Sequence, residues 1–485
     1  MFEKYEFKTT PYEHQKKALK VSWDADYYAL FMEMGTGKTK VAIDNIAVLY
    51  ERGKIKAALV IAPKGVYDNW VKNEIPTHLP DRIERRVLRW TPAKTKTYEE
   101  ELIDFVISKE PPLKIFVMNV EAFSTKRGLE AAEAFLYQNP DNFVLVDEST
   151  TIKNRKAART KNIMGLRHIS KYRRILTGSP ITKSPMDLFS QSLFLHAKAL
   201  NHNSFYAFQA RYAVVRQRTM GHRSFQEIVG YRRLDELSEK LDNFSYRVLK
   251  KDCLDLPEKV FVRREIELTK EQRSAYDQMS KLALAVLNDG ELATTASVLT
   301  QLMRCQQICC GHLTTDDGVI KELPNNRLTS LMELADEVQG KVIIWATYTH
   351  DIKKIADALS DRFGPSSVAT YYGETPQSER QEIVNWFQDP DNPLRFFVGQ
   401  PKTGGYGITL TAANTVIYYS NSYDLEIRLQ SEDRAHRIGQ TNKVTYIDLV
   451  APDTVDEKVL QALRDKIILA GEVLREEVKS WLKPS

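Results

Sequence analysis

Short apolar runs rich in β-forming residues alternate with helical stretches over the first third of the chain and again over the last third. The first set of expected strands covers 27–34, 57–62, 114–120, 143–146 and 173–177. The second set covers 341–347, 368–373, 395–399, 415–420 and 444–450. Apolar strands separated by helices need crossover connections, which produce parallel sheets buried on both faces. The sequence therefore predicts an α/β protein with two parallel sheets.

The length of the chain also favours more than one domain, because 485 residues are too many for one ordinary hydrophobic core. Between about 185 and 325 the strand pattern largely disappears, and the sequence is polar, basic and mostly helical in character. We predict an N-terminal lobe over 1–185, a helical, basic insertion and linker over 186–325, and a C-terminal lobe over 326–485.

Composition excludes several classes of protein. The chain is 42% hydrophobic and 27% charged, which is ordinary for a globular protein and argues against disorder. No apolar run approaches the roughly 18 residues that a membrane span needs. The first residues lack the apolar core of a secretion signal, and 4 cysteines cannot form a disulfide scaffold in a chain of this length. A cytoplasmic protein with reduced thiols is expected.

Positive charge is concentrated in one part of the sequence. The net charge is +5, but residues 150–251 contain 21 lysines and arginines against 6 aspartates and glutamates, so the rest of the chain is acidic. A basic block in an otherwise acidic protein suggests a polyanionic partner. The alternative is a solvated helical surface.

The sequence FMEMGTGKT at 31–39 follows an expected strand and opens an expected helix. Its glycines allow backbone N–H groups to turn towards an anion, and the helix N-terminus adds the positive end of its dipole. In such a phosphate loop the lysine contacts the β- and γ-phosphates of a nucleotide and the following hydroxyl holds Mg²⁺. The predicted nucleotide-binding residues here are Gly35, Thr36, Gly37, Lys38 and Thr39. The match is partial, because Met32 stands where the general pattern has glycine, and a chance match in a loop is the alternative.

A second motif, FVLVDE at 143–148, is an apolar strand that ends in two acids. Buried acids are costly unless they meet a metal ion or water. Asp147 is therefore predicted to complete the Mg²⁺ shell with Thr39, and Glu148 to orient and deprotonate the attacking water. An acidic loop after a strand is the alternative for this motif taken alone.

Two arginines in QSEDRAHRIGQ at 430–440 are three positions apart, so they share one face if this segment is helical. Arg434 and Arg437 could then grip a γ-phosphate as arginine fingers do. A surface helix with salt bridges is the alternative, because Glu432 and Asp433 are available as partners.

Together these motifs resemble helicase superfamily two, in particular the Swi/Snf type of double-stranded DNA translocases. The resemblance covers nearly the whole chain in the right order. The matching segments are PYEHQ at 11–15, MEMGTGKT at 32–39, LVIAP at 59–63 with Trp70, VDE at 146–148, LTGSP at 176–180, 342–347, GGYGITLTAA at 404–413 and QSEDRAHRIGQ at 430–440.

The resemblance implies two RecA-like lobes with ATP and Mg²⁺ between them, and an enzyme that is a DNA-dependent ATPase. It implies that Gln15 contacts the adenine base and that Gly407 also belongs to the nucleotide site. It places DNA on the basic group that follows Asp147 and Glu148, and the insertion adds two further candidates. The predicted DNA contacts are Lys153, Arg155, Lys156, Arg159, Arg216 and Arg218.

Two features depart from a simple reading of the motifs. The family usually writes Asp-Glu-Ala-His where this chain has Asp147-Glu148-Ser149-Thr150, so the link that the histidine provides could run through hydroxyls here. Cys305, Cys309, Cys310 and His312 cluster in sequence, but zinc sites usually take two separated pairs of ligands. The family resemblance gives this segment a structural role, and we predict that it holds no zinc.

We therefore predict an ATP-dependent double-stranded DNA translocase of the Swi/Snf type, acting without a membrane, in the cytoplasm beside the nucleoid of a bacterium or a phage-infected cell. A protein partner is left open. One alternative is a strand-separating helicase or the motor subunit of a restriction or repair system. Another is an ATP-gated DNA-binding module that remodels protein–DNA complexes without moving far.

Overall fold

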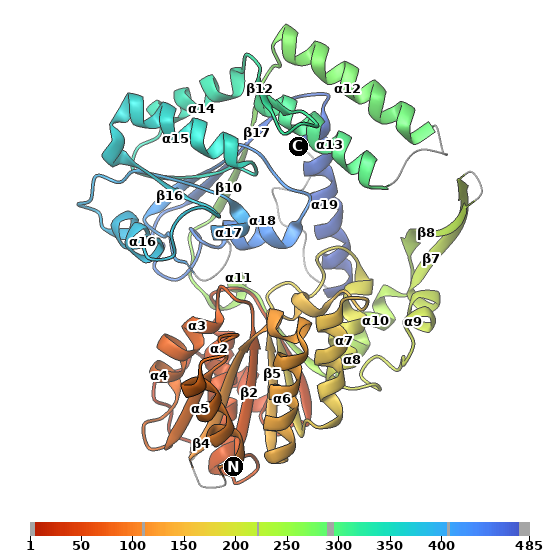
Figure 1. The fold of residues 1–485 in the computed structure, drawn as a ribbon, viewed down its shortest axis with the longest axis vertical. Helices are drawn as coiled ribbons and strands as arrows, with labels where there is room; N and C mark the ends of the chain where they lie inside the picture. The colour runs from red at the N-terminus through yellow and green to blue at the C-terminus, as the bar shows by residue number, and fades with distance from the viewer. Residues whose placement is uncertain (1–4, 109–111, 221–222, 289–294, 405–407, 475–485) are drawn as a thin grey trace. The chain divides into compact units, whose positions relative to one another are not determined.

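The computed structural model describes residues 5–108, 112–220, 223–288, 295–404 and 408–474. The described chain forms two compact units, one built around a seven-stranded sheet and the other around a six-stranded sheet (Figure 1). Each unit is described by itself.

The first unit has the strand order β3-β4-β2-β5-β6-β1-β9, and all of its strands are parallel. The strands are β1 (Tyr27–Met32), β2 (Ala57–Ala62), β3 (Arg85–Arg89), β4 (Leu113–Asn119), β5 (Asn142–Asp147), β6 (Tyr172–Leu176) and β9 (Ser245–Val248). The helices are α1 (Glu13–Ser22), α2 (Lys38–Glu51), α3 (Tyr67–Asn69), α4 (Ile75–His78), α5 (Lys96–Ile107), α6 (Lys126–Gln138), α7 (Ala158–Gly165), α8 (Leu188–Leu195), α9 (Phe205–Tyr212), α10 (Leu234–Asp242) and α11 (Lys250–Cys253).

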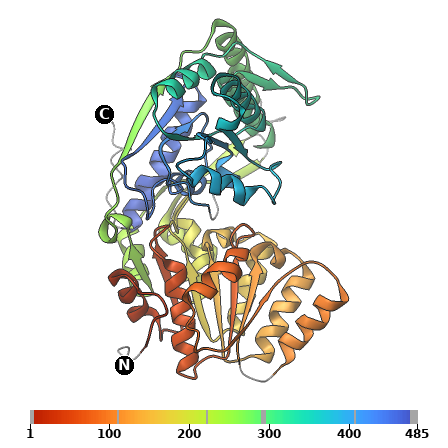
Figure 2. The ribbon, with the colours of Figure 1, turned by 90° about the vertical axis from the view of Figure 1, so that its left-hand side faces the viewer.

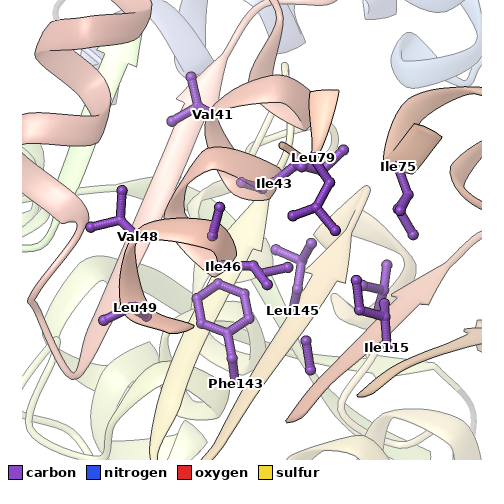
Figure 3. Close-up of a cluster of buried hydrophobic side chains, with 14 of the residues drawn as sticks. Val41, Ile43, Ile46, Val48, Leu49, Ile75, Leu79, Ile115, Phe143 and Leu145 are labelled. Carbon is purple, nitrogen blue, oxygen red and sulfur yellow. The ribbon is translucent and has the colours of Figure 1, made fainter. Parts of the chain in front are cut away.

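Helices cover both faces of this sheet (Figure 2). On one face, apolar side chains of α2, β2, β4 and β5 form one buried cluster, to which Ile46, Ile115 and Leu145 belong (Figure 3). On the other face, Phe116 of β4 contacts Phe105 of α5 and Phe135 of α6. Burying each such side chain stabilises the folded state by roughly 1.5–3 kcal/mol relative to leaving it exposed. The central strands are apolar on both faces, as the sequence predicts for a parallel sheet.

The second unit has the strand order β10-β17-β16-β13-β15-β14, again entirely parallel. The strands are β10 (Lys259–Glu265), β13 (Lys341–Trp345), β14 (Val368–Tyr371), β15 (Phe396–Gly399), β16 (Ala413–Tyr418) and β17 (Val444–Val450). The helices are α12 (Lys270–Asn288), α13 (Thr295–Cys310), α14 (Asn326–Glu337), α15 (Thr349–Phe363), α16 (Arg380–Gln388), α17 (Pro401–Gly404), α18 (Leu425–Glu432) and α19 (Val455–Leu474). Along β13, Val342 and Ile344 enter one core cluster, whereas Ile343 and Trp345 enter another, so this sheet too is buried on both faces.

The prediction of an α/β fold with two parallel sheets is confirmed. The stretch 186–325 differs from the expectation of a mostly helical segment, because it also contributes strands to both sheets. β9 pairs with β1, and β10 pairs with β17. Two further small sheets lie in this stretch: β7 (Ala213–Met220) with β8 (Arg223–Tyr231), and β11 (His312–Thr314) with β12 (Ile320–Glu322). These strands are edge or two-stranded elements with polar side chains, so they lack the continuous apolar runs that mark central strands.

Candidate active site

The phosphate loop joins the end of β1 to the start of α2. Gly35 and Gly37 have φ values of 80° and 83°, in the left-handed region that favours glycine. Gly37 is the last residue before α2, which begins at Lys38. The first N–H groups of a helix have no partner within the helix, so this turn presents donors and a positive dipole end to an anion.

The loop is held by contacts from its own backbone and from the segment after β9. The Thr36 hydroxyl donates a hydrogen bond to the Glu33 carbonyl oxygen at 2.7 Å. The Glu33 carboxylate accepts a hydrogen bond from the backbone N–H of Lys250 at 2.7 Å, and the Glu33 N–H donates to the Val248 carbonyl at 3.0 Å. The loop is therefore fixed at its first residue by a strand that is more than 200 positions away in the chain.

Gln15, the predicted adenine contact, lies against the phosphate loop. Its Nε2 donates a hydrogen bond to the Thr36 carbonyl at 3.1 Å, and its Oε1 accepts one from the Tyr12 N–H at 3.0 Å. A Cβ on Gly37 would lie 2.1 Å from Gln15 Nε2, so a larger residue there would displace the Gln15 amide from this position. His14 Nε2 lies 2.8 Å from the same Thr36 oxygen. The structure thus assigns Gln15 a role in bracing the loop, and the contact with adenine stays a prediction.

Asp147 ends β5 and is buried, with 3% of its surface exposed. Its Oδ2 accepts a hydrogen bond from Trp70 Nε1 at 2.9 Å, and its Oδ1 accepts one from the Glu148 N–H at 3.0 Å. Burial raises the pKa of this carboxyl group above its ordinary value, against the opposing effects of the Lys38 charge and the hydrogen bonds. Trp70 begins η1 (Trp70–Glu74), a π-helical turn of the kind often found at functional sites.

Glu148 and Lys38 form a buried ion pair between the two motifs. The Glu148 Oε1 and Lys38 Nζ atoms are 3.2 Å apart, and about nine-tenths of each side chain is buried. Glu148 has a φ of 47°, an uncommon conformation for a residue with a side chain. Such backbone strain clusters at functional sites. The two motifs that the sequence predicts to act together are therefore brought into contact.

The residues predicted to hold Mg²⁺ fit that ion in their chemistry. Mg²⁺ prefers oxygen ligands and is usually bound by one or two carboxylates together with water and substrate phosphates. Thr39, the second residue of α2, offers a hydroxyl, and Asp147 offers a buried carboxylate whose raised pKa a cation would lower. Among the described residues each Asp147 oxygen accepts one hydrogen bond, so further lone pairs can bind a ligand.

The Ser149 hydroxyl, next to Glu148, reaches α8, a helix that carries none of the sequence motifs. Ser149 Oγ donates a hydrogen bond to Gln191 Oε1 of α8 at 2.7 Å. Gln191 Nε2 donates in turn to the carbonyl oxygens of Pro180 and Asp187, at 2.8 and 2.9 Å. The loop after β5 and the loop after β6 are therefore linked through the Ser149 hydroxyl. The link also needs Gln191, which no sequence motif indicates.

The two arginines of the second unit converge, but not because they lie on one helix. α18 ends at Glu432, so Arg434 and Arg437 lie in the turns that follow it, and the prediction of a shared helical face is wrong. Both guanidinium groups instead donate to the Ile408 carbonyl, Arg434 at 3.0 Å and Arg437 at 3.4 Å. Arg434 is 2% exposed and also donates to the Gln430 carbonyl at 3.0 Å.

A surface helix with salt bridges was the alternative for this segment. Its two carboxylates form ion pairs with Lys259 and Arg428. Glu432 contacts Lys259 at 3.0 Å and Arg428 at 2.9 Å, and Asp433 contacts Lys259 at 3.6 Å. Ile408 follows the predicted nucleotide-site residue Gly407, which lies outside the described residues.

Two of the predicted DNA-contacting residues also hold parts of the first unit together. Lys153 Nζ donates to Thr182 Oγ1 at 2.7 Å. The Arg155 guanidinium lies 4.1 Å from the ring centre of Phe205 and 5.2 Å from that of Tyr206, within the range of cation–π attraction. Tyr206 is 67% exposed, so this group reaches the surface.

The other predicted DNA contacts fall in two separate segments, around the start of α7 and on β7. Lys156 is exposed and Arg159, in α7, is partly buried. Arg216 and Arg218 are exposed on β7, and Arg218 pairs with Glu227 of β8. All of these side chains remain predictions as DNA ligands.

The cysteine cluster is part of the core of the second unit. Cys305 and Cys309 pack in one apolar cluster with Leu425 and Val459, while Cys310 belongs to another. Burial raises the pKa of the Cys305 thiol to about 11, which disfavours the thiolate that zinc requires. His312 Nδ1 lies 3.0 Å from an Asp351 oxygen. Within the part of the chain that the structure describes, no three His, Cys, Asp or Glu residues are grouped to hold a metal ion.

Comparison with known proteins decides the family. The model of the SNF2-related domain matches residues 14–313, and that of the helicase conserved C-terminal domain matches residues 325–439. The chain belongs to the SNF2-related family. The resemblance to helicase superfamily two is thereby confirmed. No helix among the described ranges has the length and apolarity to cross a membrane.

Relatives in the SNF2-related family come from distant organisms. The putative ATP-dependent helicase/translocase YwqA of Bacillus subtilis is 27% identical over 93% of this chain and 46% of its own length. The DNA annealing helicase and endonuclease ZRANB3 of Mus musculus is 29% identical over 91% of this chain and 38% of its own. The chain thus spans less than half the length of these curated relatives.

A solved structure of a family member is also similar. The SWI2/SNF2 ATPase core of Sulfolobus solfataricus, solved in complex with double-stranded DNA, has 24% identity and a TM-score of 0.42, and the match covers 97% of this chain and 95% of that one.

Proposed function

We propose that this chain hydrolyses ATP and uses the energy to move along double-stranded DNA. The observation that carries the proposal is the buried group formed by Lys38, Asp147 and Glu148, placed at the ends of two motifs in a member of the SNF2-related family. The relatives that support it include one named as an ATP-dependent helicase/translocase.

The chemistry follows from the positions of these side chains. Lys38 and the N–H groups of the first turn of α2 bind the phosphates of ATP. Thr39 and Asp147 would hold Mg²⁺, which supplies charge stabilisation on the phosphate oxygens when bound. When phosphates compete for Lys38, the Glu148 carboxylate is released from the ion pair to orient a water and accept its proton. The strained backbone of Glu148 fixes the direction of this carboxylate.

The arginines of the second unit act on the same phosphate in this proposal. Arg437 and Arg434 supply positive charge to the γ-phosphate, as arginine fingers do. Their common contact with the Ile408 carbonyl supports the proposal because it holds both guanidinium groups at one place.

Duplex DNA is the proposed track. The excess of 15 positive charges in residues 150–251 provides phosphate contacts that are blind to base sequence. Such a motor works in the cytoplasm beside the nucleoid.

The direct test measures ATPase activity with single-stranded, double-stranded and branched DNA side by side. Duplex DNA of any sequence should stimulate turnover, and the stimulation should fall steeply with salt because phosphate contacts release counterions. Stimulation by single strands alone would favour the strand-separating helicase. A rate that does not respond to the length of circular DNA would favour the ATP-gated binding module.

A further inference from the structure

The polar side chains of α8 are unusual because this helix is buried along its whole length. Gln191 has 0% of its surface exposed. A buried amide is costly unless its donors and acceptor are paired. Gln191 meets this condition with three hydrogen bonds, one to Ser149 and two to the carbonyl oxygens of Pro180 and Asp187. One side chain thus ties together the loops that follow the neighbouring strands β5 and β6.

The first of these loops carries the proposed catalytic base. Ser149 is the residue next to Glu148, whose left-handed backbone makes its side-chain direction sensitive to the position of the following peptide. The Ser149 hydroxyl is buried and donates its proton to Gln191 at 2.7 Å. A shift of Gln191 therefore acts on Glu148 through one peptide unit.

The second loop, 177–187, reaches from the phosphate loop to the basic segment Lys153–Arg159, which holds four of the predicted DNA contacts. A Cβ on Gly178 would lie 3.1 Å from the Met34 nitrogen, so the two backbones approach closely. At the other end of the loop, the Asp187 carboxylate accepts hydrogen bonds from the N–H groups of Thr182 and Lys183, at 3.0 and 2.8 Å. The Thr182 hydroxyl also accepts a hydrogen bond from Lys153, one of the predicted DNA contacts.

α8 also contacts the basic segment directly. Ser190 Oγ donates to the Lys153 carbonyl at 3.4 Å. The ring of Phe189 lies 5.5 Å from that of Phe205, on which the Arg155 guanidinium rests. The neighbours of Gln191 on α8 thus contact Lys153 directly and Arg155 through Phe205. The Gln191 amide itself contacts Ser149, the residue next to the proposed base.

We propose that Gln191 is a positioning residue that couples DNA binding on the basic segment to the placement of Glu148. A DNA phosphate that draws Lys153 away from Thr182, or Arg155 away from Phe205, changes the contacts that hold α8 and the 177–187 loop. Gln191 passes this change to Ser149 through a hydrogen bond of fixed geometry. The inference rests on the proposed function and adds to it the residue through which DNA would stimulate hydrolysis.

The test compares Gln191→Met, Ser149→Ala and the double variant with the wild-type chain. Methionine keeps the length and volume of glutamine but makes no amide hydrogen bond. ATP turnover is measured without DNA and with saturating duplex DNA, and duplex affinity is measured separately by fluorescence anisotropy. Each single variant should lower the ratio of DNA-stimulated to DNA-free turnover by about tenfold, the usual size of coupling between sites. Duplex affinity should stay close to that of wild type.

The double variant and a matched control separate coupling from simple stability. The double variant should lose about as much stimulation as either single variant, because both substitutions break the same link. It should also regain part of the thermal stability lost by Gln191→Met, because the Ser149 hydroxyl no longer remains unpaired. Ser192→Ala is the control, since Ser192 is buried on the same helix and its hydroxyl has no hydrogen-bond partner among the described residues.

The outcomes distinguish this inference from the proposed function. Normal stimulation in Gln191→Met overturns the coupling role, as does an equal loss in Ser192→Ala. A loss of DNA-free turnover that matches the loss of stimulated turnover gives Gln191 a structural role only and also overturns it. A wild-type chain that hydrolyses ATP without any response to DNA overturns the proposed function itself, and the coupling with it.

Discussion

Trp70 donates a hydrogen bond from its indole Nε1 to Oδ2 of Asp147, at 2.9 Å, although the two residues are 77 positions apart in the chain. The indole is fully buried in a π-helical turn, so its direction is fixed by packing. The bond orients one oxygen of a carboxylate that is proposed to hold Mg²⁺. Such outer contacts commonly set the affinity of a metal site.

Trp70→Phe should therefore weaken the response to Mg²⁺ while keeping most of the buried ring. The Mg²⁺ concentration that gives half-maximal ATPase activity should rise by about tenfold or more, the scale of other losses of this kind. Trp90→Phe is the matched control, because Trp90 is also buried but packs against Tyr98 and Phe116. An unchanged Mg²⁺ dependence in Trp70→Phe would limit the indole to a packing role.

Substitution of Lys38 and substitution of Glu148 should lower activity in two different ways. Lys38→Ala should abolish both nucleotide binding and turnover, since it removes the phosphate contact. Glu148→Gln should keep ATP bound but lower turnover by about 10²–10⁴, the usual contribution of a general base. Nucleotide binding by calorimetry and turnover by phosphate release distinguish the two. Glu130→Gln on α6 serves as the control, and turnover by Glu148→Gln within a few-fold of wild type would contradict the assignment.

Arg434 and Arg437 should differ in their effect on stability, because only Arg434 is buried in its own unit. Arg437→Ala should lower turnover by about 10³, the scale of an arginine finger, with little change in Tm. Arg434→Ala should lower Tm as well, because the carbonyl oxygens of Ile408 and Gln430 lose a donor. Thermal unfolding and turnover are measured for both. Unchanged turnover in both variants would show that Arg434 and Arg437 have a structural role only.

The cysteine cluster should carry no metal. The thiols are in apolar surroundings, and burial raises the pKa of Cys305 to about 11. Metal analysis of protein purified without chelator should find well below one zinc ion per chain. A stoichiometric zinc ion that survives dialysis would show that this expectation is wrong.

Movement along a duplex should not open the strands. In a triplex-displacement assay, the chain should remove the third strand in an ATP-dependent way. In a forked-duplex assay it should release little or no single strand. Glu148→Gln provides the control for ATP dependence in both assays. Efficient unwinding of a plain duplex would support the strand-separating alternative.

The sequence predicted those parts of the fold and site that depend on local patterns. β2 and β5 are continuous apolar runs because both of their faces are buried, and the phosphate loop is recognisable because its glycines must adopt positive φ. β3 was not predicted, because this edge strand carries arginines at three of its five positions. An edge strand of this kind has too few apolar residues to be predicted from the sequence alone.

Other features depend on contacts between distant segments. Arg434 and Arg437 converge through the turns after α18. Their spacing in the sequence suggested a shared helical face, which the structure does not contain. Gln191 carries no signal at all, because a single glutamine in an apolar helix looks the same whether its partners are loops or solvent. Its role is visible only when Ser149 and Pro180 are placed around it.

The position of β9 has a consequence for biosynthesis. This strand pairs with β1, the strand that leads into the phosphate loop, yet it lies beyond residue 244. While the chain emerges from the ribosome, β1 has an unpaired edge until β9 has been translated, and unpaired edges invite misassociation. A truncated fragment that stops before β9 would keep this defect permanently. Expression of the first unit alone therefore requires a boundary after α11, well past the end of the last nucleotide-site motif in that unit.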